Sequence, residues 1–112
     1  MVKKYTPNRG DIVTINFNPQ SGREQAGKRP ALIISPKSYN AKTGLALACP
    51  ITSKVKNYPF ETKLPKQIKT KGVVLSDHVK NLDWQTRRVK FIEKLPNSHT
   101  EEVIYKLSIL LD

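Results

Sequence analysis

The chain has 112 residues, the usual size of one domain with one compact core. Hydrophobic residues make up 38% and charged residues 26%, which excludes a disordered chain and predicts a single globular domain over residues 1–112. Twenty Lys and Arg against nine Asp and Glu give a formal net charge of +11. This excess favours a polyanionic partner, above all a nucleic acid, over the alternative of a merely basic and soluble surface.

Membrane and secreted classes fit the sequence poorly. No apolar run approaches the ~20 residues that span a bilayer, and no apolar stretch follows the two lysines near the start, as it would in a signal peptide. The single cysteine, Cys49, cannot form an internal disulfide. We therefore expect a cytoplasmic protein that does not enter membranes.

Short apolar runs separated by Pro, Gly and Asn predict about six short strands. They lie at residues 11–17, 31–35, 45–49, 60–64, 73–79 and 87–93. In the first run Val13, Ile15 and Phe17 alternate with other residues, so they should share one face. The second run is apolar almost throughout, as in a strand buried on both faces. Strands this short and closely spaced predict a mainly β, antiparallel barrel or sandwich.

One helix is expected, at the C-terminal end. Residues 98–101 (SHTE) have the spacing of a capping box, in which Ser98 and Glu101 satisfy free backbone N–H groups. Four apolar residues then fall on one helix face: Val103, Ile104, Leu107 and Leu111. Residues 81–87 are compatible with a second short helix or a turn.

The long polar segment at residues 18–30 is a candidate functional loop. Its charged and amide residues include Arg23, Glu24, Gln25, Lys28 and Arg29. Such a run is usually a solvated surface, which is the alternative here. However, Pro30 favours an extended Arg29 at the start of a buried strand, where a guanidinium would be held rigidly enough to bind phosphate.

Other constellations point to specific chemistry less clearly. Thr52 and Ser53 follow the strand at 45–49, where their hydroxyls either cap a turn or donate to a phosphate oxygen. His78 and His99 are far apart, with no Cys or carboxylate at ligand spacing, so we expect no metal and no cofactor. Cys49 lies in an apolar strand and is expected to be a packed core thiol rather than a nucleophile.

Several motifs together resemble the MazF/PemK family of toxin–antitoxin ribonucleases. They are residues 9–13 (RGDIV), 24–31 (EQAGKRPA), 50–52 (PIT), 58–61 (YPFE), 72–75 (GVVL) and 77–80 (DHVK). The resemblance extends over essentially the whole chain, and the block at 24–31 is its most specific part. It implies an SH3-like β-barrel with a C-terminal helix, with one or two short helices allowed, assembled as a homodimer.

The resemblance also implies an activity and a partner. The activity is sequence-specific, metal-independent cleavage of single-stranded RNA, chiefly mRNA, which inhibits translation and growth. The partner is a cognate antitoxin whose acidic, initially disordered tail covers the site. Without a metal, the RNA's own 2′-hydroxyl is the expected nucleophile, leaving a 2′,3′-cyclic phosphate and a 5′-hydroxyl, and DNA lacks that group.

By the same resemblance, Arg29, Thr52 and Glu24 are the catalytic candidates. Arg29 is assigned to stabilising charge on the phosphate, because a guanidinium matches two phosphate oxygens. Thr52 would hydrogen-bond the same phosphate. Glu24 either acts as the base or orients Arg29.

RNA-binding residues are expected around these three. Lys54, Lys56 and Tyr58 follow Thr52, where they could grip the backbone and stack a base. Further positions in the predicted RNA groove are Gln25, Lys28, Asn40, Ser53, Asp77 and Lys80. The lysines at 63, 66, 69 and 71 either steer RNA in general or are simply solvated.

Two other functions remain open on sequence grounds. A toxin of the same fold could poison DNA gyrase without cutting nucleic acid, and a small basic domain could bind nucleic acid without catalysis. The apolar helix face either covers the barrel or contributes to a dimer.

Overall fold

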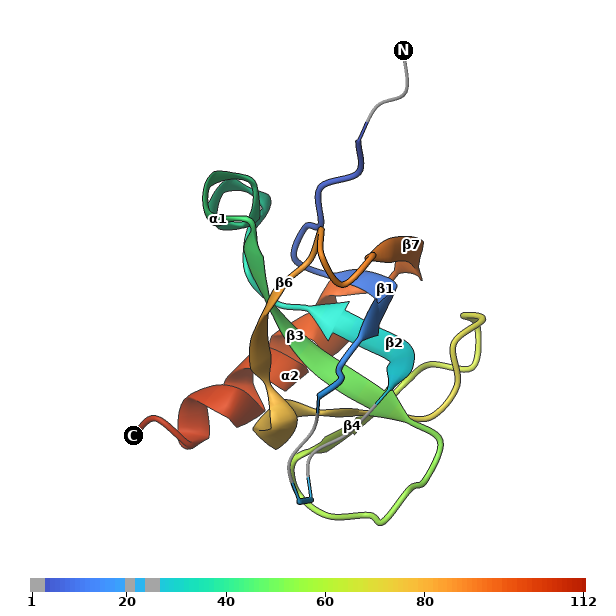
Figure 1. Cartoon of the computed structure of the whole chain (residues 1–112). Helices are drawn as coiled ribbons and strands as arrows, with labels where there is room; N and C mark the ends of the chain where they lie inside the picture. The colour runs from blue at the N-terminus through green and yellow to red at the C-terminus, as the bar shows by residue number, and fades with distance from the viewer. Residues whose placement is uncertain (1–3, 20–21, 24–26) are drawn as a thin grey trace.

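The structure is a computed structural model that describes residues 4–19, 22–23 and 27–112 (Figure 1). Its elements are β1 (Asp11–Asn16), β2 (Lys28–Ile33), α1 (Lys37–Thr43), β3 (Leu45–Thr52), β4 (Glu61–Lys63), β5 (Val73–Leu75), the short 3-10 helix η1 (Ser76–His78), β6 (Lys80–Asp83), β7 (Lys90–Lys94) and α2 (Asn97–Ile109).

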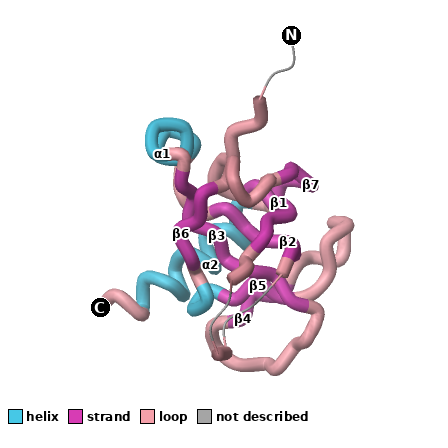
Figure 2. Tube along the Cα trace, viewed as in Figure 1, coloured by secondary structure: helices cyan, strands magenta, loops and turns pink. Residues whose placement is uncertain are grey.

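The strands form one seven-stranded sheet in the order β4-β5-β3-β2-β1-β7, with β6 also paired to β3 (Figure 2). All of these pairings are antiparallel. The long strand β3 is the centre of the sheet, because β2 pairs with it on one edge while β6 and β5 pair with it on the other. The sheet therefore brings segments from both halves of the chain to the end of β3.

The mainly antiparallel β class with a C-terminal helix is confirmed. Among the described residues the strand path is open, with β4 and β7 at its ends, so the curved sheet does not close into the expected barrel. The run at 73–79 is not one strand: it breaks into β5, η1 and β6. Residues 81–87 then form the end of β6 and a turn rather than a helix.

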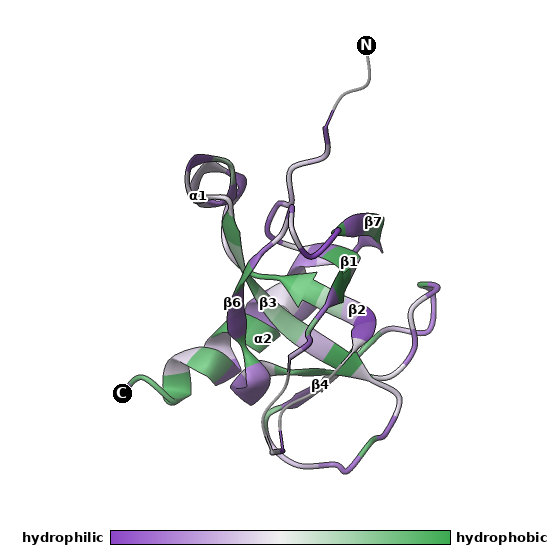
Figure 3. Ribbon diagram, viewed as in Figure 1, coloured by the Kyte–Doolittle hydropathy of each residue, from purple (hydrophilic) through white to green (hydrophobic). Residues whose placement is uncertain are grey.

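Two apolar clusters lie on opposite faces of the central strands, whose ribbons are mostly coloured hydrophobic in Figure 3. Val13, Ile15 and Phe17 share one cluster, as their alternation predicts. Along β2, Ala31 and Ile33 belong to this cluster while Leu32 belongs to the other, which confirms a strand buried on both faces. Burying such residues is the main source of the fold's stability, at about 1.5–3 kcal/mol for each large apolar side chain.

Helix α2 covers the second cluster, but its details differ from the expectation. It begins at Asn97 with Pro96 as its N-cap, and no side chain caps it, so the predicted capping box is wrong. The reason is register: Ser98 lies within the first turn, where it cannot serve as the N-cap, and the Pro96 carbonyl accepts the His99 N–H instead at 3.0 Å. Within the described ranges, no helix is long and apolar enough to cross a membrane.

The expected apolar face of α2 is only partly buried. Val103 is fully buried, and Ile104 and Leu107 pack partly against the second cluster, which supports the covering role. Leu111 lies beyond the end of the helix and is 79% exposed, so it neither belongs to the predicted helix face nor covers the sheet.

Helix α1 was not expected from the sequence. It follows Pro36 and ends at Gly44, which has φ +74° and donates its N–H to the Asn40 carbonyl at 3.0 Å. A proline before a helix and a left-handed glycine after it are common end signals, but the seven residues between them show little apolar periodicity.

Cys49 is completely buried within the second cluster, which supports the assignment as a core thiol. Burial raises the pKa of this thiol to about 12, with a smaller contribution from the negative charge of Asp77. Because only the thiolate reacts readily, we expect iodoacetamide at pH 8 to leave Cys49 unmodified in the folded protein and to alkylate it in denaturant. Intact-mass measurement checks this, and rapid alkylation of the folded protein would contradict it.

Candidate functional site

A cleft of about 380 Å³ lies at the end of β3. Residues from β2, β3, the loop after β3, β4, β5 and η1 line it together with one residue that precedes β2. They are Arg23, Arg29, Thr52, Lys54, Lys56, Tyr58, Glu61, Leu75 and His78. In Figure 1 the loop after β3 forms the lower edge of the molecule, beside the start of β2.

Strand register places Arg29 and Thr52 together. Strands β2 and β3 are antiparallel, with Ala31 opposite Pro50. The β2–β3 pairing ends at Ala31 and Pro50, and the same register continued by two residues brings Arg29 level with Thr52. Both side chains line the cleft. Residues directly opposite one another in antiparallel strands have neighbouring side chains on one face. Each of the two predicted catalytic residues is also paired with a further strand, Arg29 with Ile15 in β1 and Thr52 with Val73 in β5, so both are held within the sheet.

The Thr52 hydroxyl has a local structural role as well. It accepts the backbone N–H of Lys54 at 3.2 Å, which is the turn-capping contact that the sequence left as one alternative. A hydroxyl that accepts one hydrogen bond still has a proton to donate. Capping the turn therefore orients Thr52 without removing its capacity to bind an oxyanion.

The cleft carries an excess of positive charge. Four of its lining residues are cations, namely Arg23, Arg29, Lys54 and Lys56, whereas Glu61 is the one carboxylate among the described residues that line it. A concave surface lined by one sign of charge focuses the electrostatic potential and attracts the opposite ion. This cleft therefore suits a phosphate backbone.

Glu61 braces the loop that carries the lysines. Glu61 is 8% exposed, and its two carboxylate oxygens accept hydrogen bonds from the backbone N–H groups of Lys56 at 3.0 Å and Asn57 at 2.9 Å. Asn57 has φ +60°, a left-handed conformation that Asn adopts more readily than other non-glycine residues, and the two hydrogen bonds that Glu61 accepts hold this turn in place. Helix α2 supports the same strand, because Lys106 donates to the Glu61 carbonyl at 2.6 Å.

Replacing Glu61 with glutamine is expected to lower the free energy of unfolding by about 1–2 kcal/mol, because one of the two N–H groups would face an amide NH₂. Amide hydrogen exchange at Lys56 and Asn57 should accelerate more than exchange in β1. Thermal unfolding and exchange mass spectrometry measure both effects, with Glu101→Gln on the exposed side of α2 as the control. Unchanged exchange at these two amides would show that the carboxylate does not hold the loop.

Tyr58 connects this loop to η1. Its hydroxyl donates to Asp77 at 2.8 Å. Partial burial, the hydrogen bond and the negative charges of Asp77 and Glu61 all raise the Tyr58 pKa, so the phenol keeps its proton and remains a donor. Asp77 lines an adjoining hollow of about 290 Å³ with Arg23, His78, Val79 and Lys80. Arg23 and His78 line both spaces, which makes the cleft and the hollow one continuous surface.

The structure thus brings together most, but not all, of the residues singled out from the sequence. Arg29, Thr52, Lys54, Lys56 and Tyr58 line the cleft, and Asp77 and Lys80 line the adjoining hollow. Ser53 is exposed beside the cleft. Glu24 and Gln25 lie outside the described residues. In the described part of the chain, no three His, Cys, Asp or Glu side chains are grouped as metal ligands.

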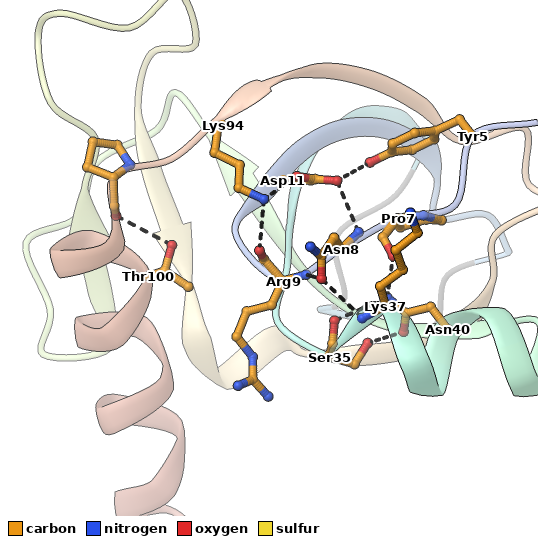
Figure 4. Close-up of polar contacts among 11 residues, drawn as sticks. Tyr5, Pro7, Asn8, Arg9, Asp11, Ser35, Lys37, Asn40, Lys94 and Thr100 are labelled. Carbon is orange, nitrogen blue, oxygen red and sulfur yellow. Dashed lines mark hydrogen bonds and ion pairs between the residues drawn. The ribbon is translucent and has the colours of Figure 1, made fainter. Parts of the chain in front are cut away.

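Two predicted RNA contacts lie elsewhere. Asn40 is fully buried, where its amide donates to the carbonyls of Pro7 and Ser35 and its side-chain oxygen accepts from the Ser35 hydroxyl (Figure 4). This burial contradicts a direct contact with RNA. Lys28 precedes Arg29 on β2, and because successive side chains of a strand alternate, it lines a different hollow with Asn16, Thr86, Arg87 and Arg88.

Comparisons with known proteins identify the family. A profile of the PemK-like, MazF-like toxins of type II toxin–antitoxin systems matches residues 8–111. The chain belongs to this family. It is 47% identical over 87 residues to the endoribonuclease toxin MazF of Escherichia coli strain K12, an alignment that covers 78% of each chain.

Solved structures of family members have the same fold. The MazF crystal structure from Deinococcus radiodurans superposes with a TM-score of 0.94 at 49% identity, covering 96% of this chain and 98% of that one. The MazE–MazF complex from the same organism gives 0.87 at 49% identity, covering 96% and 97%. The open, curved sheet with a C-terminal helix is therefore the fold of MazF.

Three polar residues of the cleft were not assigned to the site from the sequence. Arg23 was noted only as part of a charged loop, Glu61 only as part of the motif at 58–61, and His78 only as part of the motif at 77–80 and as a histidine without partners for a metal. Membership of motifs shared with MazF-like toxins was the available signal for Glu61 and His78. Their side chains reach the cleft because the chain folds back at β4 and η1, which the local sequence does not reveal.

Proposed function

We propose that this protein is the toxin of a toxin–antitoxin pair, an endoribonuclease that cleaves single-stranded RNA without a metal ion. The observation that carries the proposal is that Arg29, on β2, and Thr52, on the neighbouring strand β3, line the same cationic cleft. Membership of the MazF-like toxin family and similarity to proteins named endoribonucleases support it further.

The proposed reaction is an intramolecular transesterification at one phosphate of the RNA. A base removes the proton of a 2′-hydroxyl, whose oxygen attacks the adjacent phosphorus and forms a new O2′–P bond. The P–O5′ bond breaks, and the leaving oxygen takes up a proton. The products are a 2′,3′-cyclic phosphate and a 5′-hydroxyl, with no water consumed and no electron transferred.

Arg29 and Thr52 act on the phosphate in this scheme. The guanidinium of Arg29 can donate two parallel hydrogen bonds to the non-bridging oxygens, where negative charge increases in the transition state. Thr52 donates its hydroxyl proton to the same group. Both lie on paired strands, so their positions are set before RNA binds, and preorganised donors of this kind stabilise developing charge most effectively.

Proton transfer needs additional groups. Glu24 serves either as the base or as the residue that orients Arg29. His78 lines the same cleft, and a ring N–H of an imidazole can donate to the leaving oxygen.

The remaining cations and Tyr58 bind the RNA on either side of the cleaved bond. Lys54 and Lys56 neutralise phosphates, while Tyr58 offers a ring for a base to stack upon. Asp77 and Lys80 in the adjoining hollow extend this surface.

The proposed partners follow from membership of the MazF-like toxin family and, for the antitoxin, from the charge of the cleft. A homodimer and a cytoplasmic location are expected of this toxin, as is an antitoxin whose acidic segment competes with RNA for the cleft. The solved complex of MazE with MazF from Deinococcus radiodurans supports an antitoxin of that type.

The decisive experiment incubates the protein with a long single-stranded RNA in excess chelator and maps the ends of the fragments. Cleavage is expected, with cyclic phosphate and 5′-hydroxyl ends, and it should cease when the RNA carries a 2′-deoxy residue at the cut. Lys42→Ala removes a cation from the exposed part of α1 and should leave cleavage unchanged. Binding without cleavage would favour a non-catalytic nucleic-acid-binding protein, and a stalled gyrase–DNA complex would favour a gyrase poison.

A further inference from the structure

A second hollow, of about 420 Å³, shares none of its described lining residues with the cleft. It is lined by Lys4, Tyr5, Trp84, Gln85, Arg88 and Val89. We call it the Tyr5–Trp84 hollow. Two aromatic rings and two cations therefore meet on a part of the surface to which the proposed cleavage reaction assigns no role.

The aromatic walls of this hollow are fixed from behind. The Tyr5 hydroxyl donates at 2.5 Å to Asp11, which is 4% exposed and is also paired with Lys94 at 3.0 Å (Figure 4). The Trp84 indole N–H donates to the Asn40 carbonyl at 3.0 Å. Trp84 is only 6% exposed, whereas Tyr5 is partly buried. Because the polar atom of each ring is already hydrogen-bonded inside the protein, a ligand in the hollow would meet the carbon of the Tyr5 ring and the small exposed part of Trp84. Rigid rings of this kind form contacts with little loss of conformational entropy.

Arg88 occupies a position that favours glycine. It lies in the turn between β6 and β7 with φ +53°, a left-handed conformation that costs a non-glycine residue about 1 kcal/mol or more. The turn is closed by Arg88 N–H donating to the Gln85 carbonyl at 3.1 Å and Val89 N–H donating to the Trp84 carbonyl at 3.0 Å. An arginine at such a position is best explained by a use for its side chain, which lines the hollow.

Arg88 also joins the hollow to a neighbouring one of about 320 Å³, which is lined by Asn16, Lys28, Thr86, Arg87 and Arg88. Lys28 in turn adjoins Arg29, at the Asn16–Lys28 pair that ends the β1–β2 ladder. Among the residues that the structure describes, no carboxylate lines either hollow. Lys28, Arg87 and Arg88 thus supply cations beside the aromatic walls, on the opposite side of β2 from the Arg29 side chain, and cations next to aromatic rings are typical of proteins that bind single strands and stack their bases.

We propose that the Tyr5–Trp84 hollow binds an unpaired nucleotide of single-stranded RNA at a distance from the cleaved bond, with the base against the aromatic walls and the phosphate on Arg88 and Lys4. This inference rests on the proposed function only in naming RNA as the polyanion. Such a site would make long RNA bind more tightly than a short RNA that fills the cleft alone.

Trp84 is the only tryptophan of the chain, so its fluorescence reports directly on the hollow. The probe is a 2′-O-methyl RNA of mixed sequence and about 20 nucleotides, longer than the ~4–16 nucleotides that one OB-fold domain binds. It lacks the free 2′-hydroxyl and stays intact under the proposed mechanism. We expect it to quench Trp84, whereas an RNA of about four nucleotides binds without quenching.

Arg88→Gly tests RNA binding without loss of stability. Glycine adopts the left-handed conformation at no cost, so the variant should be as stable as the unsubstituted protein or more stable. For this variant we expect a three- to tenfold higher Kd for the long probe, as a rough estimate, and a salt dependence of log K reduced by about one. The Kd for the short RNA should not change. Lys42→Ala removes one exposed cation that lines neither hollow, so its Kd for the long probe and its salt dependence should equal those of the unsubstituted protein.

The outcomes also distinguish this inference from the proposed function. Quenching by long RNA that Arg88→Gly weakens would support the site even if unmodified RNA were never cleaved. Cleavage of unmodified RNA together with an Arg88→Gly variant of unchanged affinity and salt dependence would overturn the site and leave the enzyme intact. Quenching by polyglutamate and not by RNA would overturn it in favour of an acidic protein segment.

Discussion

Replacing Arg29 with alanine is expected to reduce the rate constant for RNA cleavage by about 10²–10³, the usual cost of removing one preorganised donor to developing negative charge. The main reason is position: Arg29 lies level with Thr52 across paired strands, so no neighbouring cation can take its place without a change in the sheet. Lys54 and Lys56 lie on a loop instead, and their long side chains would be less well oriented.

Binding should suffer much less than cleavage. Arg23, Lys54 and Lys56 remain in the cleft of the variant, so we expect the Kd for 2′-O-methyl RNA to rise by no more than about tenfold. Single-turnover cleavage and fluorescence anisotropy give the two quantities. Arg29→Lys keeps the charge but not the planar fork and should show an intermediate rate. Equal losses in rate and binding would assign Arg29 to general RNA affinity and remove it from the catalytic step.

Replacing Gly72 with alanine is expected to destabilise the protein by about 3 kcal/mol and to abolish most cleavage, although residue 72 does not line the cleft. Gly72 has φ +113°, and a Cβ atom built on it would overlap the Thr52 carbonyl oxygen. The same Cβ would stand 2.8 Å from the Thr52 carbonyl carbon and 3.1 Å from the Ser53 Cα. These are backbone atoms, so relief requires moving the strand that presents Thr52.

Gly44→Ala is the matched control for this change. Gly44 is also left-handed, at φ +74°, but a Cβ there would meet no described atom within 4 Å. It should cost only about 1 kcal/mol of stability and leave cleavage intact. Thermal unfolding should show a decrease in Tm of roughly 10–20 °C for Gly72→Ala and a few degrees for the control. Similar losses in both variants would mean that the left-handed conformation, and not the overlap with Thr52, determines the effect.

Together these variants address how the cleft depends on its surroundings. Arg29 and Thr52 are set by strand pairing, Gly72 permits β5 to approach the end of β3, and Glu61 fixes the loop that follows. The residues proposed to react thus lie on the regular part of the fold, whereas the lysines proposed to bind RNA lie on a braced but exposed loop. Under the proposed mechanism, substitutions in this loop could change which RNA sequence is preferred without removing the residues that cleave it.

The amino-acid sequence by itself determined those features that depend on nearest neighbours in the chain. Alternation of Val13, Ile15 and Phe17 identified a strand face correctly, because side chains of a strand point to opposite faces whatever else it pairs with. Family motifs pointed to Arg29 and Thr52, because each residue lies in a short block of consecutive residues that can be recognised without knowledge of the fold. Local signals were less informative where they competed, as at the N-terminus of α2, where Pro96 rather than Ser98 occupies the N-cap.

Tertiary structure alone decided which of these residues meet. Arg29 and Thr52 come together through β2–β3 register, and Glu61 and His78 reach the same cleft through β4 and η1, all contacts between segments distant in the chain. Asn40 was placed in an RNA groove from the sequence, yet its amide satisfies the buried carbonyls of Pro7 and Ser35, and no local pattern distinguishes those two uses of an asparagine. The net charge of +11 predicted a polyanionic partner, but only the fold divides that charge between the cleft and the hollows beside it. The physical reason is that composition fixes how much charge and apolar surface a chain carries, whereas strand pairing fixes which side chains share one concave surface.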